Sequence, residues 1–164
     1  MVYQRLVNEA NKPSLTKEEV AGLDIATHTG YFCLAEGGTW NFTESKKNDH
    51  KQHKAFRDTV IDFIQRNNIK QVVAEDVSVN NHFMDMRKLS EFRGILFEIC
   101  DTLNLPEPIF INPKTIKKFA TGDGNANKEK MMRFCKLRWK IDPVDDNHSD
   151  AVHIFFCYVK RFNL

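Results

Sequence analysis

Residues 71–77 (Gln-Val-Val-Ala-Glu-Asp-Val) constrain the fold more than any other segment of this sequence. They form a β-branched run, and such a run is typical of a strand that is buried on both faces in a parallel sheet. Parallel strands are joined by crossover connections, which are usually helical and right-handed. The run therefore predicts an α/β domain in which helices cover the sheet.

Shorter patterns on either side of this run complete the predicted sheet. Three strand-like segments with tight connections, at residues 20–26, 31–35 and 39–43, predict an antiparallel meander in which Gly37 and Gly38 form a turn. A fifth strand is expected at residues 108–112, and helices are expected at about residues 51–66, 89–103, 113–119, 128–138 and 146–162. The fold class is therefore α/β, with a mixed five-stranded sheet (an antiparallel three-strand meander plus parallel strands) flanked by helices. We expect this domain to span residues 20–164, after an N-terminal arm (residues 1–19) of unknown role.

The overall charge and the apolar segments exclude several classes of protein. Lys and Arg number 24 against 22 Asp and Glu, a net charge of +2, which argues against a protein that coats DNA with uniform positive charge. No apolar run approaches the roughly 18 residues that a membrane helix needs, and residues 1–13 hold no stretch of the signal-peptide type. We therefore expect a cytoplasmic protein that is not secreted and has no membrane partner. Four cysteines in apolar surroundings predict buried free thiols: Cys33, Cys100, Cys135 and Cys157.

Three acids occur where a place on the solvated surface is a weak explanation. Asp24 lies within an apolar strand, where a lone carboxylate costs several kcal/mol unless it is paired or binds a metal ion; a strand face open to solvent is the alternative. Glu75 ends the predicted parallel strand, at the edge where α/β sheets place ligands, whereas Asp76 alternates to the other face. Asp150 lies too deep in the last predicted helix to cap it.

Two neighbours of Asp150 share its helix face, namely Asp146 and Asn147. Acids at a helix start also cap the helix and complement its dipole, so Asp145 and Asp146 have this structural alternative. Strand acids and helix acids together form a predicted carboxylate cluster, whose hard oxygen ligands suit Mg²⁺ or Mn²⁺ rather than zinc. Two such ions, roughly 3.5–4 Å apart, would activate water and stabilise the leaving oxygen in phosphodiester hydrolysis.

Between residues 112 and 140 the chain is strongly basic. This segment holds nine basic residues and two acids, a net charge of +7 in a chain whose total is +2. The excess indicates a surface that follows a phosphate backbone, with Gly122 and Gly124 allowing close approach; a solvated helix face is the alternative. The basic residues are Lys114, Lys117, Lys118, Lys128, Lys130, Arg133, Lys136, Arg138 and Lys140.

Two large apolar residues, Phe83 and Met84, interrupt the otherwise polar segment at residues 80–85, within the polar stretch of residues 78–85. They are candidates for stacking on bases or for wedging between them. A hydrophobic anchor beneath a loop fits the sequence equally well.

The strand acids stand in motifs that resemble those of the RuvC family of Holliday-junction resolvases, of the phage or divergent bacterial sort. Residues 21–31 resemble the opening strand motif of that family, whose catalytic aspartate corresponds to Asp24. Residues 73–77 resemble the second motif and point to Glu75. The resemblance runs from about residue 20 to residue 160, nearly the whole chain apart from the arm.

The later motifs follow in the same order as in the family. Residues 117–128 are similar to its lysine, G-x-G and lysine segment, in which Lys117 and Lys128 would contact DNA. Residues 146–152 resemble its closing acidic motif, with Asp150 as the best-matched metal ligand. Any one of these motifs is weak evidence, whereas four in order at compatible spacing are strong evidence.

The resemblance implies a ribonuclease-H-like fold, a homodimer, hydrolysis that depends on Mg²⁺ with Mn²⁺ as a substitute, and paired nicks across a four-way DNA junction in a bacterial cell or a phage-infected host. The implied catalytic residues are Asp24, Glu75, Asp146, Asn147 and Asp150, and the four acids among them are the implied metal ligands. The implied DNA-binding residues are Lys114, Lys117, Lys118, Lys128 and Phe83.

Two departures from the family pattern bear on these roles. The family places a metal-binding residue three positions before Asp150, where this chain has Asn147 between Asp146 and His148, so the residue that completes the site stays open. Ser78 stands where an aromatic residue commonly follows the second motif, and Phe83 is the candidate substitute. This second departure bears on base wedging and on how strictly the enzyme selects junctions.

Three other functions compete with junction cleavage. The first is a less selective nuclease of the same fold that acts on branched DNA or on an RNA–DNA hybrid. The second is a sugar-kinase or actin-like ATPase, which needs two lobes and a second glycine-rich loop that do not fit in 164 residues. The third is a junction-binding protein without catalytic activity, against which the presence of all three principal acids argues.

Overall fold

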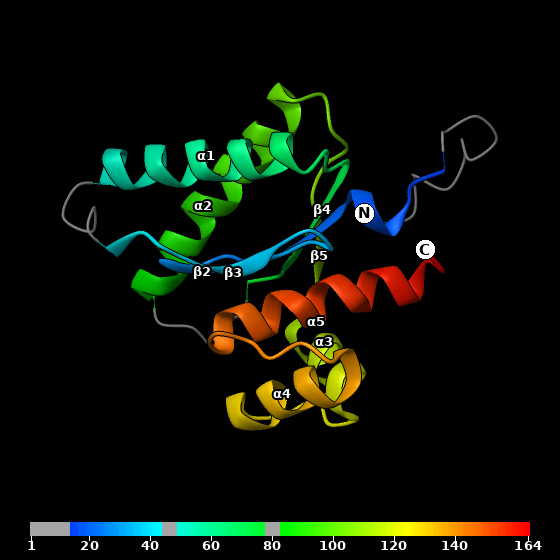
Figure 1. The fold of residues 1–164 in the computed structure, drawn as a ribbon. Helices are drawn as coiled ribbons and strands as arrows, with labels where there is room; N and C mark the ends of the chain where they lie inside the picture. Colours follow the sequence, from blue (N-terminus) through cyan, green and yellow to red (C-terminus); the bar gives the residue numbers. More distant parts are fainter. Residues whose placement is uncertain (1–13, 44–48, 78–82) are drawn as a thin grey trace.

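The computed structural model describes residues 14–43, 49–77 and 83–164, which form a mixed sheet covered by helices on both faces (Figure 1). The strands are β1 (Val20–Asp24), β2 (His28–Phe32), β3 (Gly37–Asn41), β4 (Gln71–Glu75) and β5 (Ile109–Ile111). They lie in the order β3-β2-β1-β4-β5. The first three pair antiparallel, whereas β4 pairs parallel with both β1 and β5. The predicted mixed five-stranded sheet is therefore confirmed.

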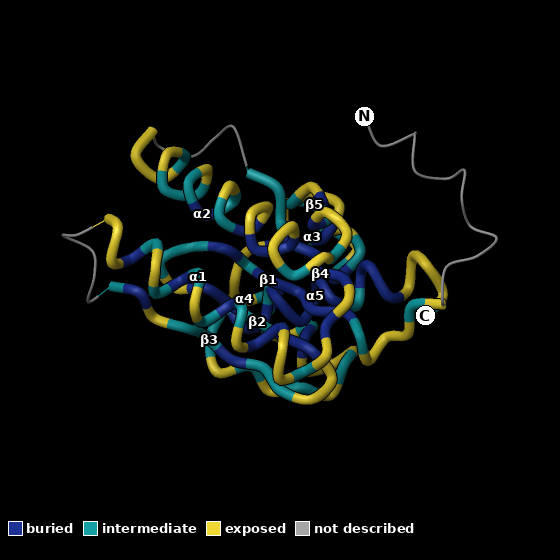
Figure 2. Tube along the Cα trace, turned by 90° about the horizontal axis from the view of Figure 1, so that it is seen from above, coloured by how far each residue is buried: buried dark blue, intermediate teal, exposed yellow. Residues whose placement is uncertain are grey.

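The helices form one layer on each face of this sheet. They are η3 (Lys17–Glu19), α1 (Asp49–Arg66), α2 (Phe83–Thr102), α3 (Pro113–Thr121), α4 (Lys128–Phe134), η5 (Cys135–Trp139) and α5 (Asp146–Arg161). In Figure 1, α1 and α2 lie on one side of the strands, and α5 lies on the other with α3 and α4 beyond it. The core is divided accordingly, since Val72 packs with α1 and α2 whereas Val73 packs with α5. Figure 2 shows the buried residues gathered along the strands and on the inner faces of the helices.

Three further expectations concern the cysteines, the arm and the membrane. All four cysteines are free and buried, as predicted. Residues 1–13 of the predicted arm lie outside the described residues; of the rest, Leu15 packs against the α5 side of the core. Among the described residues, no helix is long and apolar enough to cross a membrane.

The connections of the meander differ from the prediction. Strand β2 begins at His28 rather than at residue 31, because the Thr29 hydroxyl closes a tight turn by donating a hydrogen bond to the carbonyl oxygen of Ala26 at 2.5 Å. Gly37 and Gly38, predicted to form a turn, instead begin β3 and pair with β2. Residues 33–36 make the turn instead, and the Cys33 N–H closes it by donating a hydrogen bond to the Glu36 carbonyl oxygen at 2.8 Å.

Helix α2 is longer than its apolar periodicity predicts. The periodic residues begin at residue 89, whereas the helix begins at Phe83. Its first turn carries the exposed side chains of Phe83 and Met84, so this turn has no core-facing stripe that the sequence could reveal. The polar stretch predicted at residues 78–85 is therefore helical in its last three residues, and residues 78–82 lie outside the described part.

The basic helix predicted over residues 128–138 is divided in two. Helix α4 ends at Phe134, and the π-helical turn η5 continues to Trp139. The wider turn places the Trp139 ring in a stack on Phe156, with ring centroids 4.1 Å apart, and its indole N–H donates to His153 Nδ1 at 3.0 Å. Tertiary packing on α5 therefore overrides the regular helix that local propensity favours.

Helix α5 approaches the sheet at backbone distance. A Cβ atom on Gly22 of β1 would lie 2.4 Å from the carbonyl oxygen of Ala151, and one on Gly30 of β2 would lie 1.9 Å from that of Asn147. Real Cβ atoms do not tolerate such contacts, so glycine at both positions is what allows α5 to lie so close. The start of α5 is also tied to β3, because the Thr39 hydroxyl donates to Asp145 Oδ1 at 2.6 Å.

The close packing of α5 leads to a test by substitution at Gly22. We expect Gly22→Ala to lower the free energy of unfolding by about 1–3 kcal/mol, because the added methyl group must push α5 away from β1. Chemical denaturation followed by circular dichroism measures this change. The matched control is Gly94→Ala in α2, where nothing lies within 4 Å of an added Cβ and helix propensity favours alanine by up to about 1 kcal/mol. A Gly22→Ala variant as stable as the wild type would contradict the proposed contact.

Candidate active site

The parallel pairing of β1 with β4 brings two acids to the same edge of the sheet. Leu23 lies opposite Ala74, so Asp24 and Glu75, the last residues of their strands, leave the sheet side by side. Ligands of α/β proteins bind at the carboxyl ends of parallel strands. The two strand acids predicted from the sequence are therefore neighbours in the fold.

Two acids of α5 join them from the adjoining layer. Asp146 and Asp150 are one helical turn apart and share a face of α5. The negative charges of Asp150 and Asp146 act on Asp24, and those of Glu75 and Asp146 act on Asp150. The structure thus brings together all four acids predicted to hold metal.

The pKa values of these carboxyl groups record the burial and the crowding of negative charge. Burial, followed by repulsion from Asp150, Glu75 and Asp146, raises the pKa of Asp24 well above its usual range. Burial raises the pKa of Glu75 to about 7, and burial together with the neighbouring acids raises that of Asp150 to about 7. The site therefore resists full ionisation unless positive charge is supplied.

Two of the predicted DNA-binding lysines supply part of that charge. Lys117 of α3 opposes the rise in the pKa of both Glu75 and Asp150. Lys128, the first residue of α4, forms an ion pair with Asp146 Oδ2, and this contact raises the pKa of the lysine. Both lysines therefore lie at the border between the acids and the basic segment.

Local capping determines where these lysines stand. Helix α3 begins after Asn112, whose side-chain oxygen accepts the N–H of Lys114 at 2.9 Å, and it ends at Gly122, which has a left-handed φ of 82°. Helix α4 begins after Asn127, whose side chain accepts the N–H of Lys130 at 2.9 Å. The loop between the two caps contains Gly124. It therefore links the helix that carries Lys117 to the one that begins at Lys128.

The remaining predicted DNA-binding residues lie on the surface. Lys114 and Lys118 are exposed on α3, beside the half-buried Lys117. The side chain of Phe83 is 78% exposed at the start of α2, so it does not anchor the described core. Contact of these residues with DNA remains a prediction.

Two residues at the start of α5, Asp145 and His148, have structural roles and stand apart from the acid cluster. Asp145 is the N-cap, and its Oδ1 accepts the N–H of His148 at 2.9 Å, as the capping alternative predicted. The His148 ring is buried beside Phe32 and Gly37, and its Nδ1 accepts the N–H of Val144 at 3.2 Å. His148 therefore turns toward the meander.

That placement bears on which residue completes the predicted metal site. Asp146 acts electrostatically on both Asp24 and Asp150, whereas the backbone carbonyl of Asn147 faces Gly30. The geometry favours Asp146 over His148. A catalytic role for the Asn147 side chain stays a prediction.

The donor chemistry of the cluster fits a hard divalent cation. Across residues 14–43, 49–77 and 83–164, no three His, Cys, Asp or Glu side chains form a ready-made metal-binding group. The acids are nevertheless all carboxylates, which are the preferred ligands of Mg²⁺ and Mn²⁺. A cation would also relieve the repulsion that raises the pKa values of Asp24 and Asp150.

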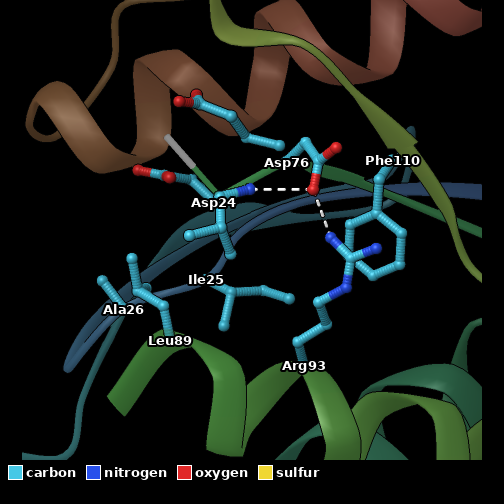
Figure 3. Close-up of a pocket in the computed structure, with 9 residues that line it drawn as sticks. Asp24, Ile25, Ala26, Asp76, Leu89, Arg93 and Phe110 are labelled. Atoms are coloured by element: carbon cyan, nitrogen blue, oxygen red, sulfur yellow. Dashed lines mark hydrogen bonds and ion pairs between the residues drawn. The ribbon is translucent and has the colours of Figure 1, made fainter. Parts of the chain in front are cut away.

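Sequence reasoning missed one charged side chain at this site. Asp24 and Glu75 line a pocket of about 190 Å³ together with Asp76, Arg93 and Phe110 (Figure 3). Arg93 follows Phe92 in α2, and a single arginine on an amphipathic helix carries no sequence signal that separates it from a solvated surface residue. Arg93 forms an ion pair with Asp76, the residue that strand alternation placed on the opposite face from Glu75.

Comparisons with known proteins agree with the motifs. A family model described as crossover junction endodeoxyribonuclease RuvC matches residues 17–158. Proteins of that name from Brachyspira hyodysenteriae and Rickettsia akari are both 29% identical to the chain, over 114 and 122 residues, which cover 69% and 73% of this chain and 71% and 77% of their own lengths. The solved structure of Thermus thermophilus RuvC in complex with a Holliday junction substrate superposes with a TM-score of 0.74 at 18% identity, covering 88% of this chain and 95% of its own. At that identity the superposition supports the fold.

The raised pKa of Glu75 makes stability depend on pH. Below the ordinary value of 4.5 the carboxyl group is neutral in both states; as the pH rises through about 7, the folded state must ionise a buried group and loses stability. Without divalent cations we expect Glu75→Gln to be more stable than the wild type at pH 8, by on the order of 2 kcal/mol, and equally stable at pH 4, below the ordinary pKa of the carboxyl group.

Urea unfolding in a chelator at the two pH values measures this difference. Glu18→Gln, at an exposed position of η3, controls for the loss of a surface carboxylate. An advantage of Glu75→Gln that is the same at both pH values would contradict the raised pKa.

Proposed function

The chain belongs to the RuvC family of crossover junction endodeoxyribonucleases, and from this premise we propose that it resolves four-way DNA junctions by paired phosphodiester nicks. It is a hydrolase with a ribonuclease-H-like fold, and its family consists of metal-dependent nucleases. The observation that carries the proposal is the convergence of Asp24, Glu75 and Asp150 beside Lys117.

The carboxylates of this site would hold the metal. Asp24, Glu75, Asp150 and Asp146 offer only oxygen ligands, so we propose Mg²⁺ as the physiological ion, Mn²⁺ as a substitute and two ions in each site. Bound there, the ions supply an activated water and stabilise charge on the scissile phosphate. The four acids provide the negative charge that retains the cations, and their half-buried position limits competing water.

The basic side of the site would bind the DNA backbone. Lys117 and Lys128 border the acids and would position the phosphates next to the scissile bond, while Lys114 and Lys118 would extend the contact along α3. Phe83, exposed at the start of α2, would stack on a base. In this proposal the DNA strand would lie with α3 and α4 on one side and the start of α2 on the other.

Paired nicks require two active sites, so we propose a homodimer in which each subunit cuts one strand. The symmetry of a two-fold dimer would then match that of a four-way junction. We also propose that the enzyme is cytoplasmic, because its DNA substrate and its four free thiols suit a reducing compartment.

Substitution of the β1 acid tests the catalytic assignment. We expect Asp24→Asn to bind a synthetic four-way junction at least as tightly as the wild type, because one negative charge is removed from the DNA-binding face. Cleavage in Mg²⁺ should fall by on the order of a thousandfold, because a metal ligand that stabilises the transition state is lost. Filter binding and gel assays measure the two properties.

Three DNA substrates sharpen this experiment, namely a four-way junction, a flap and a linear duplex, each with and without Mg²⁺. Equal cutting of the flap and the junction would favour the less selective nuclease. Asp58→Asn on the exposed face of α1 is the matched control and should cleave as the wild type does. Full activity of Asp24→Asn would falsify the assignment.

The role of Lys117 is tested by the salt dependence of binding. We expect Lys117→Gln to weaken junction binding and to reduce the slope of log K against log salt by about one, because one phosphate contact is lost. Titrations between about 50 and 200 mM salt measure the slope. Lys70→Gln, exposed just before the opposite end of β4, should leave the slope unchanged. A slope that Lys117→Gln leaves intact would count against a phosphate contact.

A further inference from the structure

An ion pair between Asp76 and Arg93 lies next to Glu75, at the end of β4. Asp76 follows Glu75 in the chain, and its Oδ1 accepts hydrogen bonds from the Val77 N–H at 2.9 Å and from Arg93 Nη1 of α2 (Figure 3). The backbone N–H of Asp76 donates to Ile111 O of β5 at 2.9 Å. Both the backbone and the side chain of Asp76 are therefore held where β4 ends.

Arg93 is itself held in place from the next strand. Its guanidinium lies over the ring of Phe110 in β5, 3.7 Å from the ring centroid. A planar guanidinium can stack flat on an aromatic face and donate to a carboxylate at the same time. Arg93 therefore connects α2 to the ends of β4 and β5, and only 32% of its side chain is exposed.

The orientation of Asp76 has a consequence for Glu75. Successive side chains of a strand point to opposite faces, so an Asp76 held toward α2 directs Glu75 toward α5, where Asp24 and Asp150 lie. The pair also forms part of the wall of the pocket that Asp24 and Glu75 line. The Asp76–Arg93 pair is therefore adjacent to the candidate active site.

We propose that Arg93 and Asp76 are a positioning pair that holds the Glu75 carboxylate toward the acid cluster. This inference rests on the proposed function, because it assigns Glu75 a role in holding metal. Neither side chain touches the reacting atoms in this proposal. Their effect passes through the backbone at the end of β4.

Three variants test the pair: Arg93→Met, Asp76→Asn and the double variant. Each is assayed for kcat and KM on a four-way junction, and the DNA-free protein is titrated with Mn²⁺ by calorimetry. Arg57→Met is the matched control, because Arg57 pairs with Glu98 across α1 and α2 at 3.0 Å, away from the end of β4.

We expect each single variant to lower kcat and Mn²⁺ affinity by about tenfold, the size of effect seen when a group that orients a metal ligand is removed. KM should change by less than about twofold, since no DNA contact is lost. The double variant should be no worse than the more impaired single variant, because the two residues act as one unit. Arg57→Met should match the wild type in all three measurements.

Two results would overturn the proposal. One is a kcat and a Mn²⁺ affinity that stay at wild-type values in Asp76→Asn, a substitution that keeps the side-chain shape and serves if Arg93→Met does not fold. The other is a raised KM in Arg93→Met that is absent in Asp76→Asn, which would assign Arg93 to direct DNA contact. A wild-type protein that fails to cut the junction would refute the proposed function instead, and the Mn²⁺ titration would still test the pair.

Discussion

The close approach of α5 to β1 and β2 is the constraint on which the site depends. At Gly22 and Gly30 the helix backbone occupies the space that any larger side chain would need. This contact brings Asp150 within electrostatic reach of Asp24, although the two residues lie at opposite ends of the chain. A helix displaced by a single methyl group would carry Asp150 away from the strand acids. Packing at two glycines is therefore a condition for the chemistry as well as for the fold.

Proximity of the acids creates an electrostatic problem that the rest of the structure reduces. Burial raises the pKa of Glu75 to about 7, and burial together with repulsion from Glu75 and Asp146 raises that of Asp150 to about 7, so these carboxyl groups hold their protons more tightly. Lys117 offsets part of that charge, and Lys128 pairs with Asp146. The whole chain carries a charge of only +2, so the arrangement of charge, and not its total, prepares the site for cations and phosphates.

Local sequence patterns predicted the five strands of the sheet, although not all of their ends, because periodicity reports directly on burial. The β-branched run identified β4 and its terminal Glu75, and apolar neighbours made Asp24 conspicuous. Patterns failed where tertiary contacts decide. Stacking of Trp139 on Phe156 accompanies a π-helical turn that no propensity indicates. The partner of Asp76 could not be inferred either, because it depends on how α2 lies across β5.

At the end of β4, side-chain alternation sends Glu75 and Asp76 to opposite faces of the sheet. One residue faces α5 and the acid cluster, and the next faces α2 and the guanidinium of Arg93. A carboxylate that experiences repulsion from its neighbours tends to turn away from them, so its direction must be held by something other than the cluster itself. An ion pair on the opposite face can do this, because it fixes the backbone from which Glu75 projects. At the end of β4, one face therefore carries the proposed metal ligand Glu75, and the opposite face carries the Asp76–Arg93 pair that orients it.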